Sequence, residues 1–183
     1  MVEAAKMTNE AKTSTAEREG KYLTFSLAEE EYGIGILKVK EIIGVMPITT
    51  VPRTPSFIKG VINLRGKVIP VVDLRLKFGM EETDYTERTC IIVVEIRGQT
   101  NQILMGVVVD SVSEVLNFKE NDIEETPRFG VRLETDHILG IAKANQGIKI
   151  LLDIDSVLNK DGMVEMERSL NQKDQISGLG DVT

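Results

Sequence analysis

Apolar and polar residues alternate along several short stretches of the chain, and this period of two predicts β-strands. The first such stretch is residues 21–27, in which one face is apolar and carries Leu23, Phe25 and Leu27. The opposite face is mixed and carries Tyr22, Thr24 and Ser26. The pattern therefore predicts a strand that is buried on one face only. After an acidic turn, residues 32–36 are predicted to return as the second strand of a hairpin.

Residues 57–80 form the segment around which the rest of the chain is arranged. The apolar residues Ile58, Val61, Ile62 and Leu64 predict one β-strand. Residues 68–72 form a second strand that is apolar at nearly every position, which predicts burial on both faces. Gly66 between these strands accepts the positive φ angle of a tight turn. Arg65 therefore lies at the tip of a hairpin, where its charge must face water or a partner.

Further apolar segments complete a mainly β pattern. The additional strands that we predict are residues 90–96, 102–109, 138–144 and 148–152, with a short one at 48–51. Three segments fit two structures each: residues 37–44 fit helix or strand, 74–78 a helical turn or strand end, and 112–118 strand or turn. Residues 153–158 predict a short helix, and residues 120–128 predict an acidic loop.

The chain contains an internal repeat. Two pairs match at an offset of 80 residues, namely Gly60 with Gly140 and Asp73 with Asp153. Three further pairs match at an offset of 73, namely Gly33 with Gly106, Val39 with Val112 and Glu41 with Glu114. The two halves therefore look like copies of one β unit, and short strands separated by Gly and Pro are typical of small barrels.

This pattern predicts a mainly all-β fold of two SH3-like five-stranded β-barrels packed on each other, with short helical turns. Residues 21–80 and 88–160 are the predicted halves of one domain, and an exchange of strands between them stays open. Residues 1–20 lack an apolar period and are predicted to be a disordered tail. Residues 161–183 are predicted to be a polar C-terminal tail.

Composition narrows the classes of function. The formal charge of −7 argues against binding nucleic acid, because phosphate recognition needs a basic surface. Cys90 is the single cysteine, which excludes an internal disulfide and fits a reducing compartment, and the isolated His137 makes no recognisable metal site. No apolar run nears the roughly 20 residues of a membrane span. We therefore expect a cytoplasmic protein without membrane insertion.

The sequence shows no catalytic constellation and no glycine-rich phosphate loop, so we expect neither enzyme activity nor a cofactor. Asp73, Asp110 and Asp153 are separate carboxylates that fit capping or turn roles. A protein-binding surface remains as the candidate function. Arg65 on a rigid turn suits an interface as well as a solvated turn, because arginine is enriched at interface hot spots. Glu41 is its natural opposite charge, but from the residues alone a plain exposed carboxylate is the favoured interpretation of Glu41.

Four motifs of the first half resemble the CheW family of bacterial chemotaxis coupling proteins. They are EYGI at residues 31–34, ILKVKEI at 36–42, FIKGVINLRG at 57–66 and PVVDLR at 70–75. GVVVDSV at residues 106–112 resembles the matching segment of the family's second half. The resemblance covers about residues 20–160, and the spacing around its central motif is highly specific.

The resemblance implies a non-enzymatic scaffold that links the cytoplasmic tips of transmembrane chemoreceptors to the regulatory domain of the histidine kinase CheA. It implies two five-stranded barrels, recruitment to receptor arrays and a monomer in isolation. The family's coupling surface falls on Glu41 and Arg65. The receptor-facing positions that it implies are Val39, Gly60, Gly106, Val112 and Val115.

From the residues alone, several of these positions have a second interpretation. Val39 and Val112 fit the core as well as a groove, and Val115 fits the core. Gly60 and Gly106 fit strand positions where another backbone approaches closely. Two other functions also stay open: an adaptor of the same fold in another receptor-kinase pathway, such as surface motility or second-messenger output, and a small-molecule-binding β-barrel or enzyme.

Overall fold

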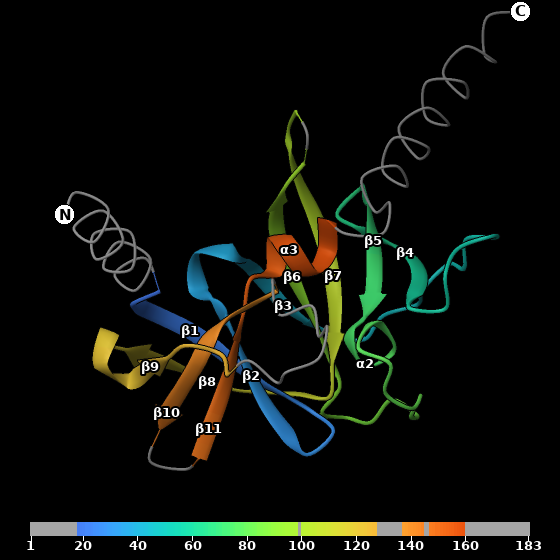
Figure 1. Cartoon of the computed structure of the whole chain (residues 1–183). Coiled ribbons are helices and arrows are strands. Elements are labelled where there is room, and N and C mark those ends of the chain that lie inside the picture. Colours follow the sequence, from blue (N-terminus) through green and yellow to red (C-terminus); the bar gives the residue numbers. More distant parts are fainter. Residues whose placement is uncertain (1–17, 99, 128–136, 145–146, 160–183) are drawn as a thin grey trace, which may run out of the picture.

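The computed structural model describes residues 18–98, 100–127, 137–144 and 147–159, which form two β-sheets with short helical segments (Figure 1). The first sheet consists, in spatial order, of β8 (Ser111–Phe118), β1 (Gly20–Leu27), β2 (Glu30–Gly35), β11 (Gly147–Leu152), β10 (Ile138–Ala144) and β9 (Ile123–Glu124). The second consists of β3 (Val39–Gly44), β6 (Cys90–Arg97), β7 (Gln102–Val109), β5 (Lys67–Asp73) and β4 (Ile58–Leu64). Helices α2 (Leu74–Lys77) and α3 (Ile154–Asn159) and the 3-10 turns η1 (Ile36–Lys38) and η2 (Glu120–Asp122) complete the described elements. The mainly all-β prediction is confirmed.

Each sheet takes strands from both halves of the repeat. In the first sheet, β2 pairs in parallel with β11, and Gly33 lies opposite Leu151. In the second sheet, β7 pairs in parallel with β5, and Gly106 lies opposite Val71. These two rungs are equivalent, because Gly33 and Gly106 are one repeat pair and Val71 and Leu151 differ by the offset of 80. The strands are therefore exchanged, and Figure 1 shows β2 beside β11. We call the first sheet the first barrel and the second sheet the second barrel.

The two barrels share one apolar core. Its largest cluster joins residues of the first barrel, such as Phe25 and Leu152, with residues of the second, such as Ile92 and Val107. Phe25 and Ile92 are completely buried. Fully burying one such side chain stabilises a fold by roughly 1.5–3 kcal/mol. The shared cluster therefore holds the two barrels together.

The prediction that β1 is buried on one face only is wrong. Its apolar face packs in the shared core, but Tyr22 is 4% exposed and Thr24 is fully buried. The Tyr22 ring packs on Phe118 with centroids 6.0 Å apart, in a smaller cluster inside the first barrel. The Thr24 hydroxyl donates to the backbone oxygen of Glu114 at 2.8 Å. Barrel closure thus covers the face that alternation alone assigns to solvent.

Four other segments differ from the simplest interpretation of their pattern. Residues 37–44 divide into the end of η1 and the strand β3. Residues 48–51 make only one β-bridge, between Thr49 and Val61. The predicted acidic loop at 120–128 contains η2 and β9, because Ile123 is 6% exposed and anchors the segment on β10. Val68 is 50% exposed, so residues 68–72 are not buried throughout.

The remaining predicted elements agree with the structure. The strands near 21–27, 32–36, 90–96, 102–109, 138–144 and 148–152 are present, residues 112–118 lie in β8, and 153–158 overlap α3. The ambiguous residues 74–78 contain α2. The predicted tails, residues 1–20 and 161–183, lie almost entirely outside the described residues, so they stay predictions.

Candidate functional site

Glu41 and Arg65 form an ion pair on the surface of the second barrel. The two terminal guanidinium nitrogens of Arg65 donate to the two carboxylate oxygens of Glu41, at 2.8 and 2.5 Å. This two-bond geometry orients the guanidinium more strictly than a single contact does. The hydrogen bond and the negative charge of Glu41 raise the pKa of Arg65. Even so, the Arg65 side chain stays 75% exposed, against 27% for Glu41.

The turn between β4 and β5 fixes the position of Arg65. Leu64 pairs with Lys67, so Arg65 and Gly66 form a two-residue hairpin loop. Both have positive φ angles, 53° and 84°, as a type I′ turn requires. The side-chain oxygen of Asn63 accepts a hydrogen bond from the Gly66 backbone at 2.9 Å. Arg65 therefore lies on a short, hydrogen-bonded turn and not on a flexible loop.

Gly60 and Gly106 lie on one rung of the second barrel, on either side of Val71. Gly60 has a φ of 141°, and a Cβ atom there would lie 2.0 Å from the backbone oxygen of Thr49. A Cβ at Gly106 would lie 2.9 Å from a methyl group of Ile91. Both positions are buried, and the structure supports the interpretation as sites of close approach.

The three predicted valines differ in exposure. Val39 begins β3 and Val112 lies near the start of β8, and both are half-buried against the shared core. Val115 on β8 is 49% exposed. The structure thus joins Glu41 with Arg65 and Gly60 with Gly106, whereas Val112 and Val115 belong to the other barrel. The seven predicted residues are therefore divided between the two barrels and do not form one cluster.

Sequence reasoning missed several exposed apolar side chains. Val68 follows the Arg65 turn in β5, and its repeat partner Ile148 follows the corresponding turn in β11 at 61% exposure. Ile42 lies next to Glu41 and is 44% exposed. Leu37 in η1 is 91% exposed. The offset of 80 residues could have paired Val68 with Ile148, but an apolar run alone does not reveal which member faces water.

Two of the three separate aspartates have the predicted capping role, whereas Asp110 has a different one. Asp73 caps α2 by accepting from the Leu76 backbone at 3.3 Å, and Asp153 accepts from the Ser156 backbone at 3.4 Å. Asp110 joins the barrels, because its carboxylate accepts from the Ala28 backbone and from the Arg75 side chain, each at 2.7 Å. This contact raises the pKa of Arg75. These carboxylates are already used in structural contacts.

The described residues contain no group of three or more His, Cys, Asp or Glu side chains that could hold a metal ion. No helix of the described part of the chain is long and apolar enough to cross a membrane. An oriented charge pair on a barrel that also carries exposed apolar side chains suits contact with another protein. Fold and site together define a protein-binding module of two barrels.

Comparisons with known proteins give this module a family. The CheW-like domain family matches residues 21–162. Chemotaxis protein CheW of Klebsiella aerogenes is 42% identical over 142 residues, which cover 78% of this chain and 83% of the relative. Protein FrzA of Myxococcus xanthus is 32% identical over 150 residues, which cover 81% of this chain and 91% of the relative.

A solved structure agrees with these sequences. The crystal structure of the scaffolding protein TtCheW from Thermoanaerobacter tengcongensis matches with a TM-score of 0.69 and 40% identity, and covers 79% of this chain and 95% of that one. The chain belongs to the CheW family. It is a chemotaxis adaptor, and the predicted fold of two SH3-like barrels is confirmed.

Proposed function

We propose that this adaptor links the cytoplasmic tips of transmembrane chemoreceptors to the regulatory domain of the histidine kinase CheA. Membership of a family that includes a scaffolding protein supports this assignment. A scaffold acts by binding two partners at once and needs neither catalysis nor a cofactor. The protein is a monomer in isolation and is cytoplasmic until its partners recruit it to receptor arrays.

The exposed Glu41–Arg65 pair is the observation that carries the proposal. A surface arginine held by two hydrogen bonds has already lost much of its rotamer freedom, so little further entropy is lost when a partner binds. The exposed N–H groups of Arg65 that do not bind Glu41 can donate hydrogen bonds to a partner, while Glu41 keeps the guanidinium in place. We assign this pair to the coupling surface.

The receptor-facing surface is proposed to include the three predicted valines. Val115 is exposed enough to touch a receptor directly, while Val39 and Val112 form half-buried edges of the shared core. Gly60 and Gly106 contribute to the receptor-facing surface indirectly. Their lack of a side chain lets Thr49 and Ile91 approach, so a substitution at either glycine would displace neighbours rather than remove a contact.

Arg65→Ala tests the coupling surface. Truncating an arginine anchor of an interface weakens binding by about thirtyfold, so the variant should bind the kinase regulatory domain or a receptor tip about that much more weakly. Its denaturant unfolding should stay close to that of the wild type, because the side chain is largely exposed. The measurement is a binding titration beside an unfolding curve.

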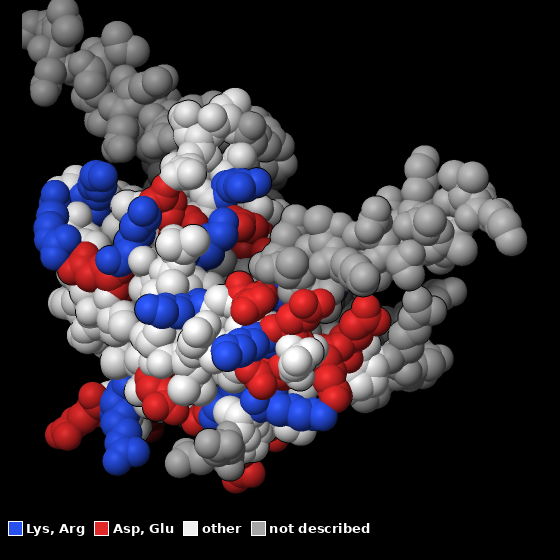
Figure 2. Space-filling model, turned by 90° about the vertical axis from the view of Figure 1, so that its left-hand side faces the viewer, with Lys and Arg blue, Asp and Glu red and all other residues white. Residues whose placement is uncertain are grey.

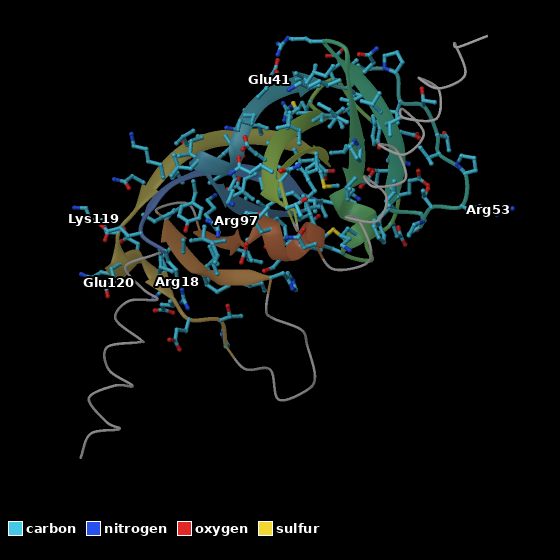
Figure 3. All side chains as sticks on the ribbon, turned by 90° about the horizontal axis from the view of Figure 1, so that it is seen from above. Arg18, Glu41, Arg53, Arg97, Lys119 and Glu120 are labelled. Atoms are coloured by element: carbon cyan, nitrogen blue, oxygen red, sulfur yellow. The ribbon has the colours of Figure 1, made fainter. Side chains whose placement is uncertain are left out.

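Arg53→Ala is the matched control. Arg53 is also exposed and also has a positive φ angle, of 60°, but it lies at the outer end of the β3–β4 connection, far from Glu41 (Figure 3). It should bind normally. Glu41→Ala should weaken binding in the same direction as Arg65→Ala, and the double variant should fall short of additivity. Normal binding by Arg65→Ala would remove this turn from the coupling surface.

An adaptor of the same fold in another receptor-kinase pathway is the second candidate. The similarity to Protein FrzA favours keeping it, because relatives of this chain do not all carry the chemotaxis name. Pull-downs with candidate receptor tips and kinases from each pathway separate the two functions. Capture of a kinase from a non-chemotaxis pathway in preference to CheA would establish the second candidate.

A further inference from the structure

The repeat gives each barrel an equivalent edge at which the terminal strand of the sheet faces the tip of a hairpin. In the second barrel these are β3 and the β4–β5 turn, and the pair Glu41–Arg65 connects them. In the first barrel they are β8 and the end of the β10–β11 hairpin. A bulge follows Val39 in the β3–β6 pairing, and the β8–β1 pairing has a bulge after the repeat partner Val112. Glu114 therefore occupies the place of Glu41.

The charge at the two edges differs. The residue 80 positions after Arg65 is Asn145, which is uncharged and lies outside the described residues. The Glu114 backbone is held by Thr24, whose hydroxyl donates to the Glu114 oxygen at 2.8 Å and accepts from its nitrogen at 3.2 Å. Its side chain is exposed, and no described residue forms an ion pair with its carboxylate. The first barrel thus keeps the carboxylate without the arginine.

A pocket of about 370 Å³ lies beside Glu114, between β8, η2 and the β10–β11 hairpin. Leu116 and Phe118 supply apolar walls. Its charged lining residues are Glu114, Asp122, Lys143 and Lys149. A long side chain with an apolar stem and a polar end fits such a lining.

The charges of the pocket favour a cation. Lys149, which is 5% exposed, forms an ion pair with Glu31, and Lys143 forms one with Glu124. Both lysines are therefore neutralised by carboxylates outside the lining. Glu114 and Asp122 remain, and among the described residues the Asp122 carboxylate accepts only from the Lys119 backbone, at 2.9 Å. Figure 2 shows acidic and basic side chains interspersed on this side of the molecule, so the preference for a cation is local to the pocket.

We propose that this pocket receives an arginine side chain from a protein partner, which forms with Glu114 the pair that Arg65 forms with Glu41. The second barrel contains the equivalent ion pair, in which the chain itself supplies the arginine, Arg65. Arginine fits better than lysine, since its planar fork binds both oxygens of a carboxylate and its stem packs on Leu116. The inference rests on the proposed function only for the identity of the partner.

A titration with N-acetyl-arginine amide, followed by NMR of the backbone amides, tests the pocket directly. The neutral isostere N-acetyl-citrulline amide is the control ligand. We expect shift changes concentrated at Glu114, Leu116 and Asn117 with the arginine compound and several-fold smaller changes with citrulline. Glu114→Gln should abolish the difference, and Glu29→Gln, at the exposed β1–β2 turn, should keep it. Equal shifts for the two compounds, or unchanged shifts in Glu114→Gln, would overturn the proposal.

Binding to the protein partners is the second measurement. Reversing the charge with Glu114→Arg should weaken binding to the kinase regulatory domain or the receptor tip by about tenfold or more, because like charges then meet. Glu29→Arg should bind normally. If Glu114→Arg binds both partners as tightly as the wild type, the pocket is no docking site. If the wild type binds neither partner, the proposed function fails, whereas the amide titration still decides the pocket.

Discussion

The two barrels have the same arrangement of strands but differ in the side chains at one edge. This edge is where β3 faces the β4–β5 turn in the second barrel and where β8 faces the β10–β11 hairpin in the first. Gly60 and Gly140 both sit where a neighbouring backbone crosses closely, that of Thr49 in the second barrel and that of Glu124 in the first. The bridge from Thr49 to Val61 corresponds to the pairing of Glu124 with Ile141. The repeated glycines therefore fix the same backbone crossing in both barrels.

The side chains beside β3 and β8 differ between the barrels, although the backbone does not. The second barrel connects β3 to its hairpin with the Glu41–Arg65 pair, whereas the first leaves a pocket beside Glu114. The comparison teaches that this repeat preserves the glycines and caps that the fold needs, and the carboxylate of Glu41 as Glu114, but not the arginine that pairs with it. Differences between equivalent surface positions are therefore the better guide to function.

Separating the two halves should give the largest effect. A half-chain ending at Glu81 keeps β1 and β2 but loses β8 and β11, with which they pair. It also exposes the shared core, so we expect it to aggregate or to show no cooperative unfolding. Near-ultraviolet circular dichroism and sedimentation would measure this. A monomeric fragment with a sharp transition would show that the barrels are independent.

Substituting the crossing glycine of the second barrel should give the next largest effect. Gly60→Ala puts a Cβ 2.0 Å from the Thr49 oxygen at a φ of 141°, and we expect it to lower the free energy of unfolding by about 3 kcal/mol. Gly106→Ala meets a methyl group of Ile91 at 2.9 Å rather than backbone at 2.0 Å, and without the positive φ angle of Gly60, so it should cost about half as much. Chemical denaturation measures both losses.

Gly44→Ala is the control for these glycines, because it lies in β3 with nothing within 4 Å of the added carbon. Its effect should stay within about 0.5 kcal/mol. A small loss for Gly60→Ala would mean that Thr49 can move away, and that the backbone plan is less rigid than the repeat implies.

Removing the equivalent helix caps should give smaller effects than Gly60→Ala and should reveal an asymmetry. Asp153→Ala loses a cap on α3 and should cost about 1 kcal/mol. Both carboxylates also accept from a hydroxyl, that of Tyr85 at 3.1 Å for Asp73 and that of Ser156 at 2.9 Å for Asp153. Asp73→Ala should cost more, about 2 kcal/mol, because Asp73 itself is only 4% exposed and its loss leaves the Tyr85 hydroxyl without that partner. Burial, with the nearby Asp73 charge, raises the pKa of Tyr85. Equal losses for the two caps would show that Tyr85 contributes no more to its cap than Ser156 does.

Most strands could be predicted from the sequence, because alternation and β-branched runs are local signals. The partners of these strands could not, since β2 pairs with β11 across almost the whole domain. Residues 120–128 concealed β9, because a strand of two residues has no period to detect. Pairing between distant segments depends on packing that no short window contains.

The candidate site was predictable in part. Glu41 was named as the natural opposite charge of Arg65, with a plain exposed carboxylate as the favoured alternative, and the two side chains do meet. The sequence could not show that Val68 is exposed, because an apolar run looks the same at the rim of a barrel as in its centre. The pocket beside Glu114 depends on segments that meet only after folding.

The exchange of strands also affects the order of events during synthesis. Tyr32 of β2 pairs with Ile150 of β11, which is made 118 residues later. At 5–20 residues per second, the ribosome needs about 6 to 24 s to supply that partner. Through that interval an edge of β2 has no partner strand, and unpaired edges invite aggregation. The nascent first half is therefore a natural client for a chaperone that shields exposed strand edges.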